Sequence, residues 1–262
     1  MTDKTHHRAR KRFGQHFLAD TAVVQQIVNT IAVGESDHVV EIGPGLGVMT
    51  EAILPLARYL DAVELDRDLV SKLNQSLPLG KFAIHSADAL KFEFCSLVKE
   101  QEKLRIVGNL PYNISTPLIF RLLEQLQCIE DMHFMLQKEV VNRLAASPGH
   151  GSYGRLSVMV QYYCRVEKLF DVAPDAFSPP PKVDSSVVRL IPHPKPPVDV
   201  QEKQTFDKVV SAAFAQRRKT LRNNLKSMIE ADQMHAAGID PGRRAETLTL
   251  QEFATLSNII SQ

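Results

Sequence analysis

Three carboxylates and a glycine-rich loop stand where short apolar runs of the sequence end. The segment "VVEIGPGLGVMT" places Glu41 two residues before Gly43, the first glycine of a G-x-G-x-G loop. Glu64 ends the run "YLDAVE" 21 residues after Gly43, and Asp88 ends the run "FAIHSAD". Glycines let a backbone approach a ligand closely, and a carboxylate at the end of the second apolar run, as Glu64 is, can hold both hydroxyls of a ribose. Asp88 is placed to accept from the amino group of an adenine.

These residue types predict a ligand made of an adenosine and a cationic tail. S-adenosylmethionine carries a sulfonium and an ammonium group, which suit an acidic rim, whereas the pyrophosphate of NAD does not. The glycine spacing also departs from the G-x-G-x-x-G of dinucleotide-binding oxidoreductases, which are the alternative enzyme class. We expect Leu65 and Ala89 to flank the adenine. The alternative without a ligand is a tight turn beside surface acids.

The stretch "GNLPY" follows a fourth apolar run and carries a second set of chemical groups. The exocyclic amine of adenine is a poor nucleophile, because its lone pair is delocalised into the ring. Asn109 Oδ1 and the Leu110 carbonyl could accept hydrogen bonds from this amine, and Pro111 fixes the backbone that aims the carbonyl. Tyr112 offers a face on which a base can stack. The alternative is a proline turn with Tyr112 packed on a neighbour.

The elements that would position these groups alternate between strand and helix. Because parallel strands end at one edge of a sheet, ligands bind at that edge. Two further apolar runs close the series, and we expect them to form an antiparallel hairpin at the sheet edge. The expected strands are 38–43, 59–66, 82–88, 104–109, 131–137, 168–173 and 183–191, and the expected helices 48–57, 67–77, 115–126, 138–146 and 152–164.

The remaining chain reads as a separate helical part. The segment "IPHPKPPVD" holds four prolines in nine residues, which is typical of a linker, and 201–230 and 245–260 have helical periodicity. We therefore predict an α/β domain over residues 1–195 and a small all-helical domain over 196–262.

Charge and composition narrow the class of protein further. The net charge is only +1, but residues 213–227 hold five basic and no acidic side chains, and residues 8–12 hold four and none. Such segregation is typical of a protein that binds a polyanion, although a solvated helix face is the alternative. No apolar run predicts a membrane span. Three dispersed cysteines without a CxxC pair indicate neither a disulfide framework nor a zinc site, and a reducing cytoplasm is expected.

Several motifs together resemble one family, the KsgA-type ribosomal RNA adenine dimethyltransferases. They run over nearly the whole chain and read "ExGPGxGxxT", "VELDRD", "GNLPYNISTP", "MLQKEVVNRL", "YGRLSVMVQYY", "FSPPPKVDSSVVRL" and "AFAQRRKTLRNNL". The resemblance implies a Rossmann-like methyltransferase fold with a mainly parallel seven-stranded sheet, helices on both faces and a helical C-terminal domain.

The resemblance also implies a reaction and its residues. Family members transfer methyl groups from S-adenosylmethionine, without a metal, to N6 of two adjacent adenosines in the 3′-terminal hairpin of 16S rRNA during small-subunit maturation. Asn109, Leu110 and Tyr112 would frame the target base. By the motifs, the contacts to S-adenosylmethionine would fall on His16, Leu18, Gly43, Glu64, Asp88 and Asn109. His16 stands where relatives often have Asn, and we expect it to be neutral beside the cationic donor.

The basic residues would then grip RNA. Helical spacing would align Arg218, Arg222 and Lys226 on one face, with Arg8, Arg10, Lys11 and Arg12 adding to the surface. The modest total charge favours an immature small ribosomal subunit over naked RNA, and we expect a monomer. Two alternatives stay open: a large-subunit methyltransferase of the antibiotic-resistance type, and an assembly checkpoint factor whose binding matters more than its catalysis.

Overall fold

The structure, a computed structural model, describes residues 16–77, 80–99 and 101–261. The basic segment at residues 8–12 lies outside these described residues. Contacts divide the chain into two compact units. The first contains the described residues up to Val141 and Glu167–Ile191, and the second contains Asn142–Val166 and the described residues from Pro192 onward. Among the described helices, none is long and apolar enough to cross a membrane.

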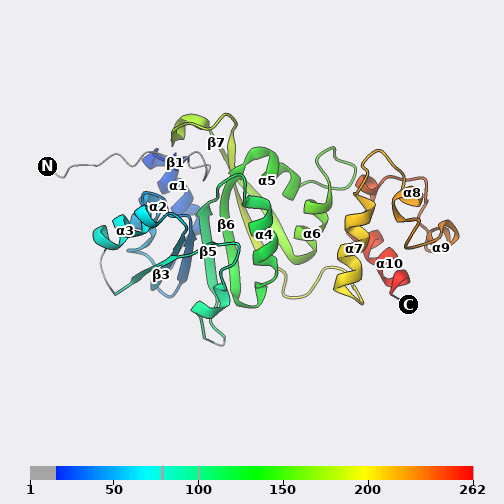
Figure 1. The fold of residues 1–262 in the computed structure, drawn as a ribbon, viewed down its shortest axis with the longest axis horizontal. Helices are drawn as coiled ribbons and strands as arrows, with labels where there is room; N and C mark the ends of the chain where they lie inside the picture. Colours follow the sequence, from blue (N-terminus) through cyan, green and yellow to red (C-terminus); the bar gives the residue numbers. More distant parts are fainter. Residues whose placement is uncertain (1–15, 78–79, 100, 262) are drawn as a thin grey trace. The chain divides into compact units, whose positions relative to one another are not determined.

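A seven-stranded sheet forms the centre of the first unit, in the order β4-β3-β2-β5-β6-β9-β7 (Figure 1). The five strands from β4 to β6 pair in parallel, and β9 pairs antiparallel with β6. The predicted seven-stranded, mainly parallel sheet is therefore confirmed. Its strands are β2 (His38–Ile42), β3 (Tyr59–Glu64), β4 (Phe82–Ser86), β5 (Leu104–Asn109), β6 (Ile129–Gln137), β7 (Cys164–Val172) and β9 (Ser185–Pro192).

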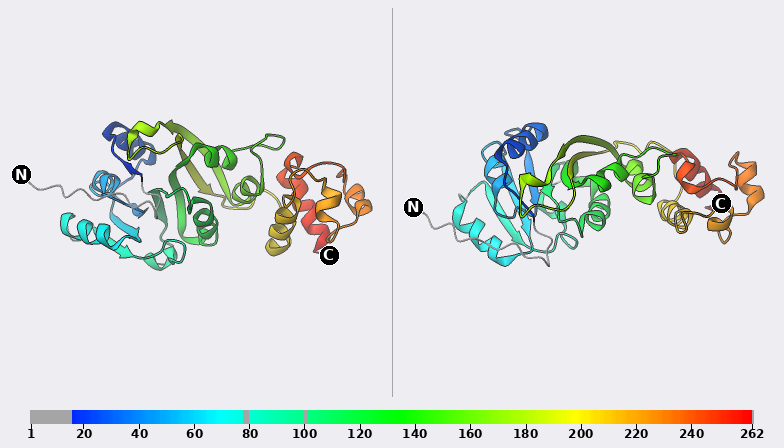
Figure 2. Two further views of the ribbon diagram at one scale, coloured as in Figure 1. Left: turned by 45° about the horizontal axis from the view of Figure 1, so that its top comes forward. Right: turned by 90° about the horizontal axis from the view of Figure 1, so that it is seen from above.

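Helices cover both faces of this sheet, and Figure 2 shows α1 and α4 on opposite sides of it. Every residue of β2 is buried, as expected for a parallel strand covered on both faces. The side chain of Asp20 caps α1 by accepting from the amides of Ala22 and Val23. The helices of this region are α1 (Thr21–Ile31), α2 (Val48–Ile53), α3 (Arg67–Ser76), α4 (Ser115–Leu123) and α5 (Lys138–Leu144).

The carboxyl ends of β2, β3, β4 and β5 form one rim, because these strands run parallel and in register. At this rim a Cβ on Gly108 would lie 2.5 Å from the Ile42 carbonyl oxygen, so β5 approaches β2 too closely for any side chain there. A separate two-stranded ribbon pairs β1 (Phe17–Leu18) antiparallel with β8 (Phe177–Ser178). The ribbon is short, and sequence analysis did not predict it.

The second unit is helical apart from the start of β7 and the end of β9. Its helices are α6 (Arg155–Tyr163), α7 (Lys203–Ala213), α8 (Leu221–Leu225), α9 (Ala231–Ala236) and α10 (Leu250–Ile260). Sequence analysis places the domain boundary after residue 195, whereas contacts group residues 142–166 with the C-terminal helices. The reason is apolar packing: the ring of Tyr162 on α6 lies 4.8 Å from that of Phe206 on α7.

The range 201–230, which has helical periodicity in the sequence, contains more than one helix in the structure. Helix α7 ends at Ala213 and α8 starts only at Leu221, so residues 201–230 do not form one helix. The side chain of Asn224 donates to the Ala213 carbonyl at 2.6 Å and to the Gln216 carbonyl at 3.1 Å, which holds the turn between the helices. The expected single helical face for Arg218, Arg222 and Lys226 is therefore wrong, because Arg218 lies in the turn.

Two cysteines are joined, contrary to the expectation from their spacing. Cys95 and Cys128 form a disulfide although 33 residues separate them in the chain. Cys95 lies in a 3-10 helix (Phe94–Leu97) before β5, and Cys128 ends another (Leu126–Cys128) before β6. Because β5 and β6 are neighbours, the connections that precede them meet. Spacing along the sequence does not reveal this proximity.

Candidate functional site

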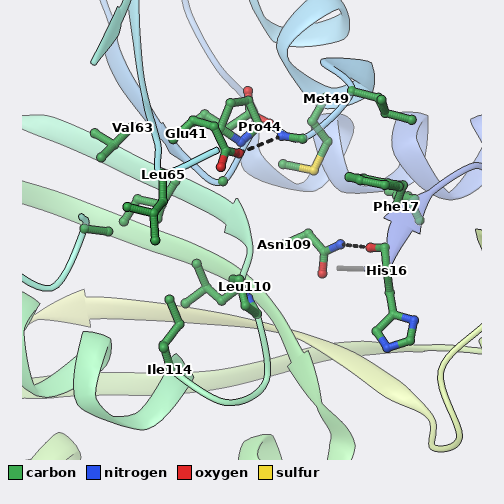
Figure 3. Close-up of a pocket in the computed structure, with 18 of the residues that line it drawn as sticks. His16, Phe17, Glu41, Pro44, Met49, Val63, Leu65, Asn109, Leu110 and Ile114 are labelled. Carbon is green, nitrogen blue, oxygen red and sulfur yellow. Dashed lines mark hydrogen bonds between the residues drawn. The ribbon is translucent and has the colours of Figure 1, made fainter. Parts of the chain in front are cut away.

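A cavity of about 370 Å³ opens at the rim formed by the ends of β2, β3, β4 and β5. Pockets of about 300–1,000 Å³ are typical of small-molecule sites. The structure brings every residue of the predicted site to this one cavity, which is lined by His16, Leu18, Gly43, Glu64, Asp88, Asn109, Leu110 and Tyr112 among others. Figure 3 shows His16, Asn109 and Leu110 at this cavity. These residues come from segments up to 96 positions apart in the sequence, from His16 to Tyr112.

The glycine loop forms one wall of the cavity. Gly43, Gly45 and Gly47 have φ values of 68°, 58° and 86°, a region that residues with a side chain seldom adopt. A Cβ on Gly45 would lie 3.0 Å from the ring of Phe17, so β1 lies directly against the loop. Glycine here serves both the turn and this close approach.

Glu41 lies at the base of the loop and is 2% exposed. The hydroxyl of Thr50, on α2, donates to its carboxylate at 2.6 Å. Burial raises the pKa of Glu41 to about 7, and the nearby charge of Glu64 adds to the rise although the Thr50 hydrogen bond opposes it. A cation beside Glu41 would favour its ionised form and lower this pKa, because burial penalises the negative charge when no cation is near.

Glu64 ends β3 and turns its carboxylate toward the glycine loop. One oxygen accepts from the Asp66 amide at 2.8 Å, and the other accepts a long bond from the Gly45 amide at 3.4 Å. Burial raises the pKa of Glu64 more than these amide donors lower it. Since a carboxylate offers about four lone-pair sites, both oxygens can accept further hydrogen bonds from a ligand.

Asp88 follows β4 on the same rim. One of its oxygens accepts from the Leu90 amide at 3.0 Å, which fixes the turn and leaves the other oxygen for a ligand. Leu65 is 53% exposed although it is apolar and lines the cavity, and Ala89 is 8% exposed. The two residues that we expect to flank an adenine therefore border the cavity next to Glu64 and Asp88.

Asn109 ends β5 and has a fixed orientation. Its side-chain Nδ2 donates to the His16 carbonyl at 2.9 Å (Figure 3). This hydrogen bond fixes the orientation of the amide. Its oxygen, Oδ1, receives no hydrogen bond from the described residues and can accept one from a ligand. The Leu110 amide donates to the Met135 carbonyl at 3.2 Å, which ties the next residue to β6. The predicted acceptor, Asn109 Oδ1, is thus held in a defined position.

Tyr112 borders the cavity beyond Asn109. Its hydroxyl shares a hydrogen bond of 2.7 Å with the Ser185 hydroxyl on β9, and its ring stacks against the His16 imidazole with centroids 5.8 Å apart. Burial raises the pKa of Tyr112 more than the Ser185 hydrogen bond lowers it, so the hydroxyl stays protonated. The imidazole of His16 donates through Nδ1 to the Pro179 carbonyl at 2.8 Å.

Sequence reasoning missed four residues that shape this site: Phe17, Thr50, Pro179 and Ser185. Thr50 ends the motif "ExGPGxGxxT", so its place three residues after the last glycine was a usable signal. The other three act across long separations in the chain, 73 residues in the case of Tyr112 and Ser185. Their partners follow only from strand pairing, which no local pattern discloses.

The charge of the cavity is one-sided. Among the described residues, its lining contains Glu41, Glu64 and Asp88 but neither Lys nor Arg. Within the described ranges no group of three His, Cys, Asp or Glu side chains is arranged to hold a metal ion. Two carboxylates with raised pKa values and no cationic partner fit the sulfonium and ammonium of S-adenosylmethionine, whereas they would repel a phosphate.

Comparison with known sequences gives a consistent result. The family described as "Ribosomal RNA adenine dimethylase" matches residues 6–262. A Pseudomonas aeruginosa protein named ribosomal RNA small subunit methyltransferase A is 54% identical over 100% of this chain and 98% of its own length. A Marinomonas protein of the same name is 52% identical over 99% of this chain and 98% of its own.

Solved structures agree on the fold. A dimethyladenosine transferase from Plasmodium falciparum superposes with a TM-score of 0.76 at 26% identity, covering 92% of this chain and 96% of that one. The 23S rRNA methyltransferase ErmE superposes with a TM-score of 0.69 at 24% identity over 94% of this chain and 100% of its own, which supports the fold alone. Because the family model matches residues 6–262 and a relative is 54% identical over the full chain, the protein belongs to the ribosomal RNA adenine dimethylase family.

Proposed function

We propose that this protein uses S-adenosylmethionine to dimethylate N6 of two adjacent adenosines in the 3′-terminal hairpin of 16S rRNA, within an immature small ribosomal subunit. Family membership and the names of its relatives support an rRNA adenine as the substrate. The main support for this chemistry is the orientation of the Asn109 amide. Its Nδ2 donates to the His16 carbonyl, so its Oδ1 can accept a hydrogen bond from the target amine.

The donor side is formed by the acidic residues of the rim. Glu64 would accept from the two ribose hydroxyls, as the carboxylate after the second strand does in related folds. Asp88 would accept from the adenine amine of the donor, between Leu65 and Ala89. Glu41 would neutralise positive charge near the glycine loop, because a cation there would offset the cost that burial and the charge of Glu64 place on its ionised form. Leu18 in β1 lines the same cavity, as does His16 immediately before this strand. When bound, S-adenosylmethionine supplies the electrophilic methyl group.

The acceptor side is formed by Asn109, Leu110 and Tyr112. Asn109 Oδ1 and the Leu110 carbonyl would accept the two N6 hydrogens and so restore a lone pair that is delocalised in the free base. Tyr112 would hold the flipped base by stacking. An amide cannot act as a base, so the proton leaves after the N–C bond forms, when the nitrogen is acidic.

The second unit supplies the RNA-binding surface in this proposal. Arg218, Lys219, Arg222 and Lys226 are exposed, and no ion pair involves them in the part of the chain that the structure describes. Arg217 differs, because it contacts Glu246 at 3.3 Å. Four unpaired cations in nine residues can neutralise phosphates without reading sequence. We assign RNA or subunit binding to the predicted helical domain, residues 196–262, and methyl transfer to residues 1–195.

The decisive variant is Asn109→Ala. Loss of a fixed hydrogen-bonding group at a reacting centre typically costs about 100-fold or more in kcat. We expect this loss in methyl transfer from radiolabelled S-adenosylmethionine to immature small subunits. Asn74→Ala, which removes an exposed amide from α3, is the matched control and should keep the wild-type rate. An Asn109→Ala protein with wild-type kcat would refute the assigned chemistry.

The RNA substrate is tested separately. Adenosines should be mapped in the rRNA of a strain that lacks the gene: the small-subunit hairpin should lose its dimethyl marks, whereas persistence of those marks would favour the large-subunit alternative.

Immature subunits should be methylated faster than naked 16S rRNA, and equal rates would reject the particle as the preferred substrate. The proposal takes the enzyme to act as a cytoplasmic monomer, and a dimer in analytical ultracentrifugation would contradict that part.

A further inference from the structure

The ring of His16 lies at the acceptor end of the cavity. Figure 3 shows its imidazole pointing away from Met49 and Pro44, while its backbone carbonyl faces the Asn109 amide. The imidazole instead stacks on Tyr112, with ring centroids 5.8 Å apart and planes 27° apart. His16 therefore contacts the two residues proposed to hold the target base.

Both rings of this stack are tethered to one short stretch of chain. The His16 Nδ1–H donates to the Pro179 carbonyl at 2.8 Å, and the Tyr112 hydroxyl is bonded to Ser185 at 2.7 Å. Ser185 is fully buried and paired with Gln137 across β9 and β6, so the Tyr112 tether is rigid. The His16 tether depends on the short β1–β8 ribbon, which pairs only two residues on each strand.

The separation of the rings has a direct consequence for the substrate. Centroids 5.8 Å apart are in direct stacking range, so the rings leave no space between them for a third ring. His16 and Tyr112 both line the cavity, so an adenine that enters the cavity would meet the face of Tyr112 that the imidazole covers. Base entry on this face therefore requires the imidazole to move.

We infer that His16 is a specificity-determining residue of the acceptor site: its carbonyl orients the Asn109 amide, and its imidazole occupies the stacking face of Tyr112 until an adenine displaces it. This inference rests on the proposed function. Displacement breaks one hydrogen bond, to the Pro179 carbonyl, and exchanges a small ring for the larger adenine. A base that stacks poorly would not displace the imidazole, so the closed arrangement disfavours pyrimidines.

His16 is also expected to contact the donor, but its imidazole points away from Pro44 in the glycine loop (Figure 3). The predicted signature is therefore a change in the KM for RNA that is larger than any change in donor affinity. The apparent affinity for a ligand is reduced by the fraction of protein that is competent to bind it. Removing the imidazole in His16→Ala keeps the carbonyl that orients Asn109, and should lower the KM for immature small subunits by about three- to tenfold. His16→Phe, which keeps a ring on Tyr112, should not lower the KM.

The experiment measures kcat and KM of both variants with immature small subunits, and the affinity for S-adenosylmethionine by calorimetry. Gln25→Ala, on the exposed face of α1, is the control for a neutral substitution in the same region. Calorimetry also shows that each variant is folded. A KM for His16→Ala that is unchanged or raised would overturn the inference, as would a tenfold loss of donor affinity. If wild-type protein methylates no small subunits, the proposed function itself fails, which is a distinct result.

Discussion

Two groups of buried carboxylates lie on the same sheet, and their surroundings differ. Near the amino ends of the strands, Asp131 accepts from Arg105 at 2.9 Å and from Arg189 at 3.0 Å, and Asp61 is bonded to two histidines at 2.6 Å each. At the carboxyl ends, Glu41 and Glu64 have only hydroxyl and amide donors within the described part of the chain. One group is matched by cationic or titratable partners, and the other is not.

The pKa values follow this difference in partners. Burial raises the pKa in all four cases, but hydrogen bonds from His38 and His85 bring the pKa of Asp61 below its usual value. Hydrogen bonds and charges from Arg105 and other partners do the same for Asp131. Glu41 has no such partner, and its pKa rises to about 7. Carboxylates with similarly low exposure therefore have pKa values shifted in opposite directions. Their hydrogen-bonding and charged partners account for the direction of the shift.

The carboxylates with cationic or histidine partners stabilise the fold, whereas we propose that those without such partners bind a ligand. A buried charge without a partner is costly, so a carboxylate left in that state needs a compensating role. A cationic donor molecule would complete the rim as Arg105 completes the other group. Three substitutions test this distinction, and a fourth, at Tyr112, tests the acceptor side of the same rim.

The largest effect is expected for Arg105→Leu. Arg105 also donates to Asp37 at 2.8 Å and to the Ile31 carbonyl at 2.7 Å, which ends α1. Its loss would leave buried acceptors unpaired, at a cost of about 3–5 kcal/mol in the free energy of unfolding. Urea denaturation measures this. The control is Arg58→Leu, whose exposed pair with Glu102 should contribute much less to the free energy of unfolding. Equal effects would remove the distinction.

Glu41→Gln should act with the opposite sign. The folded pKa of Glu41 lies above its unfolded value, so the folded state binds the extra proton between pH 4.5 and about 7 and loses stability as the pH rises through this range. At pH 8 the substitution should raise the free energy of unfolding, by on the order of 3 kcal/mol at most. At pH 4 it should change little. A loss of stability at pH 8 would show that the Glu41 charge is already compensated without a ligand.

Glu64→Gln should affect the ligand more than the fold. Hydrogen bonds to a charged acceptor are stronger than those to a neutral one, so we expect about tenfold weaker binding of S-adenosylmethionine. Isothermal titration calorimetry at pH 8 gives this number, and thermal unfolding of the free protein is the companion measurement. If Glu64→Gln destabilises the free protein as much as Arg105→Leu does, Glu64 belongs with the structural carboxylates.

The smallest effect is expected for Tyr112→Phe. The ring face survives and only the bond to Ser185 is lost, so kcat should stay within about threefold of wild type. Ser185→Ala should give the same change, and the double variant should add nothing, because both remove one hydrogen bond. Tyr112→Ala removes the stacking surface and should cost at least about tenfold. Full activity of Tyr112→Ala would exclude Tyr112 from the mechanism.

Local sequence patterns were sufficient for the sheet and the rim. The ends of β2, β3, β4 and β5 follow from apolar runs that stop at glycine, acid or amide residues, and they place Gly43, Glu64, Asp88 and Asn109 together. The resemblance to a family supplied His16 and Leu18. Contacts fixed by distant pairing were not predictable: the His16 carbonyl on Asn109 spans 93 residues. The interruption after Ala213 depends on Asn224, whose side chain competes for helix carbonyls in a way that periodicity does not show.

Gly108 fixes more than a close approach of two strands. The glycine loop starts at the end of β2 and the stretch from Leu110 to Tyr112 follows β5, and the pairing of the two strands together with the close approach of Gly108 to the Ile42 carbonyl fixes how near they lie. Side chains in either loop can therefore change during evolution and alter affinity for the donor or for the base, while the alignment of the two reactants stays the same. A side chain at position 108, in contrast, would push the two strands apart and change the spacing of both loops at once.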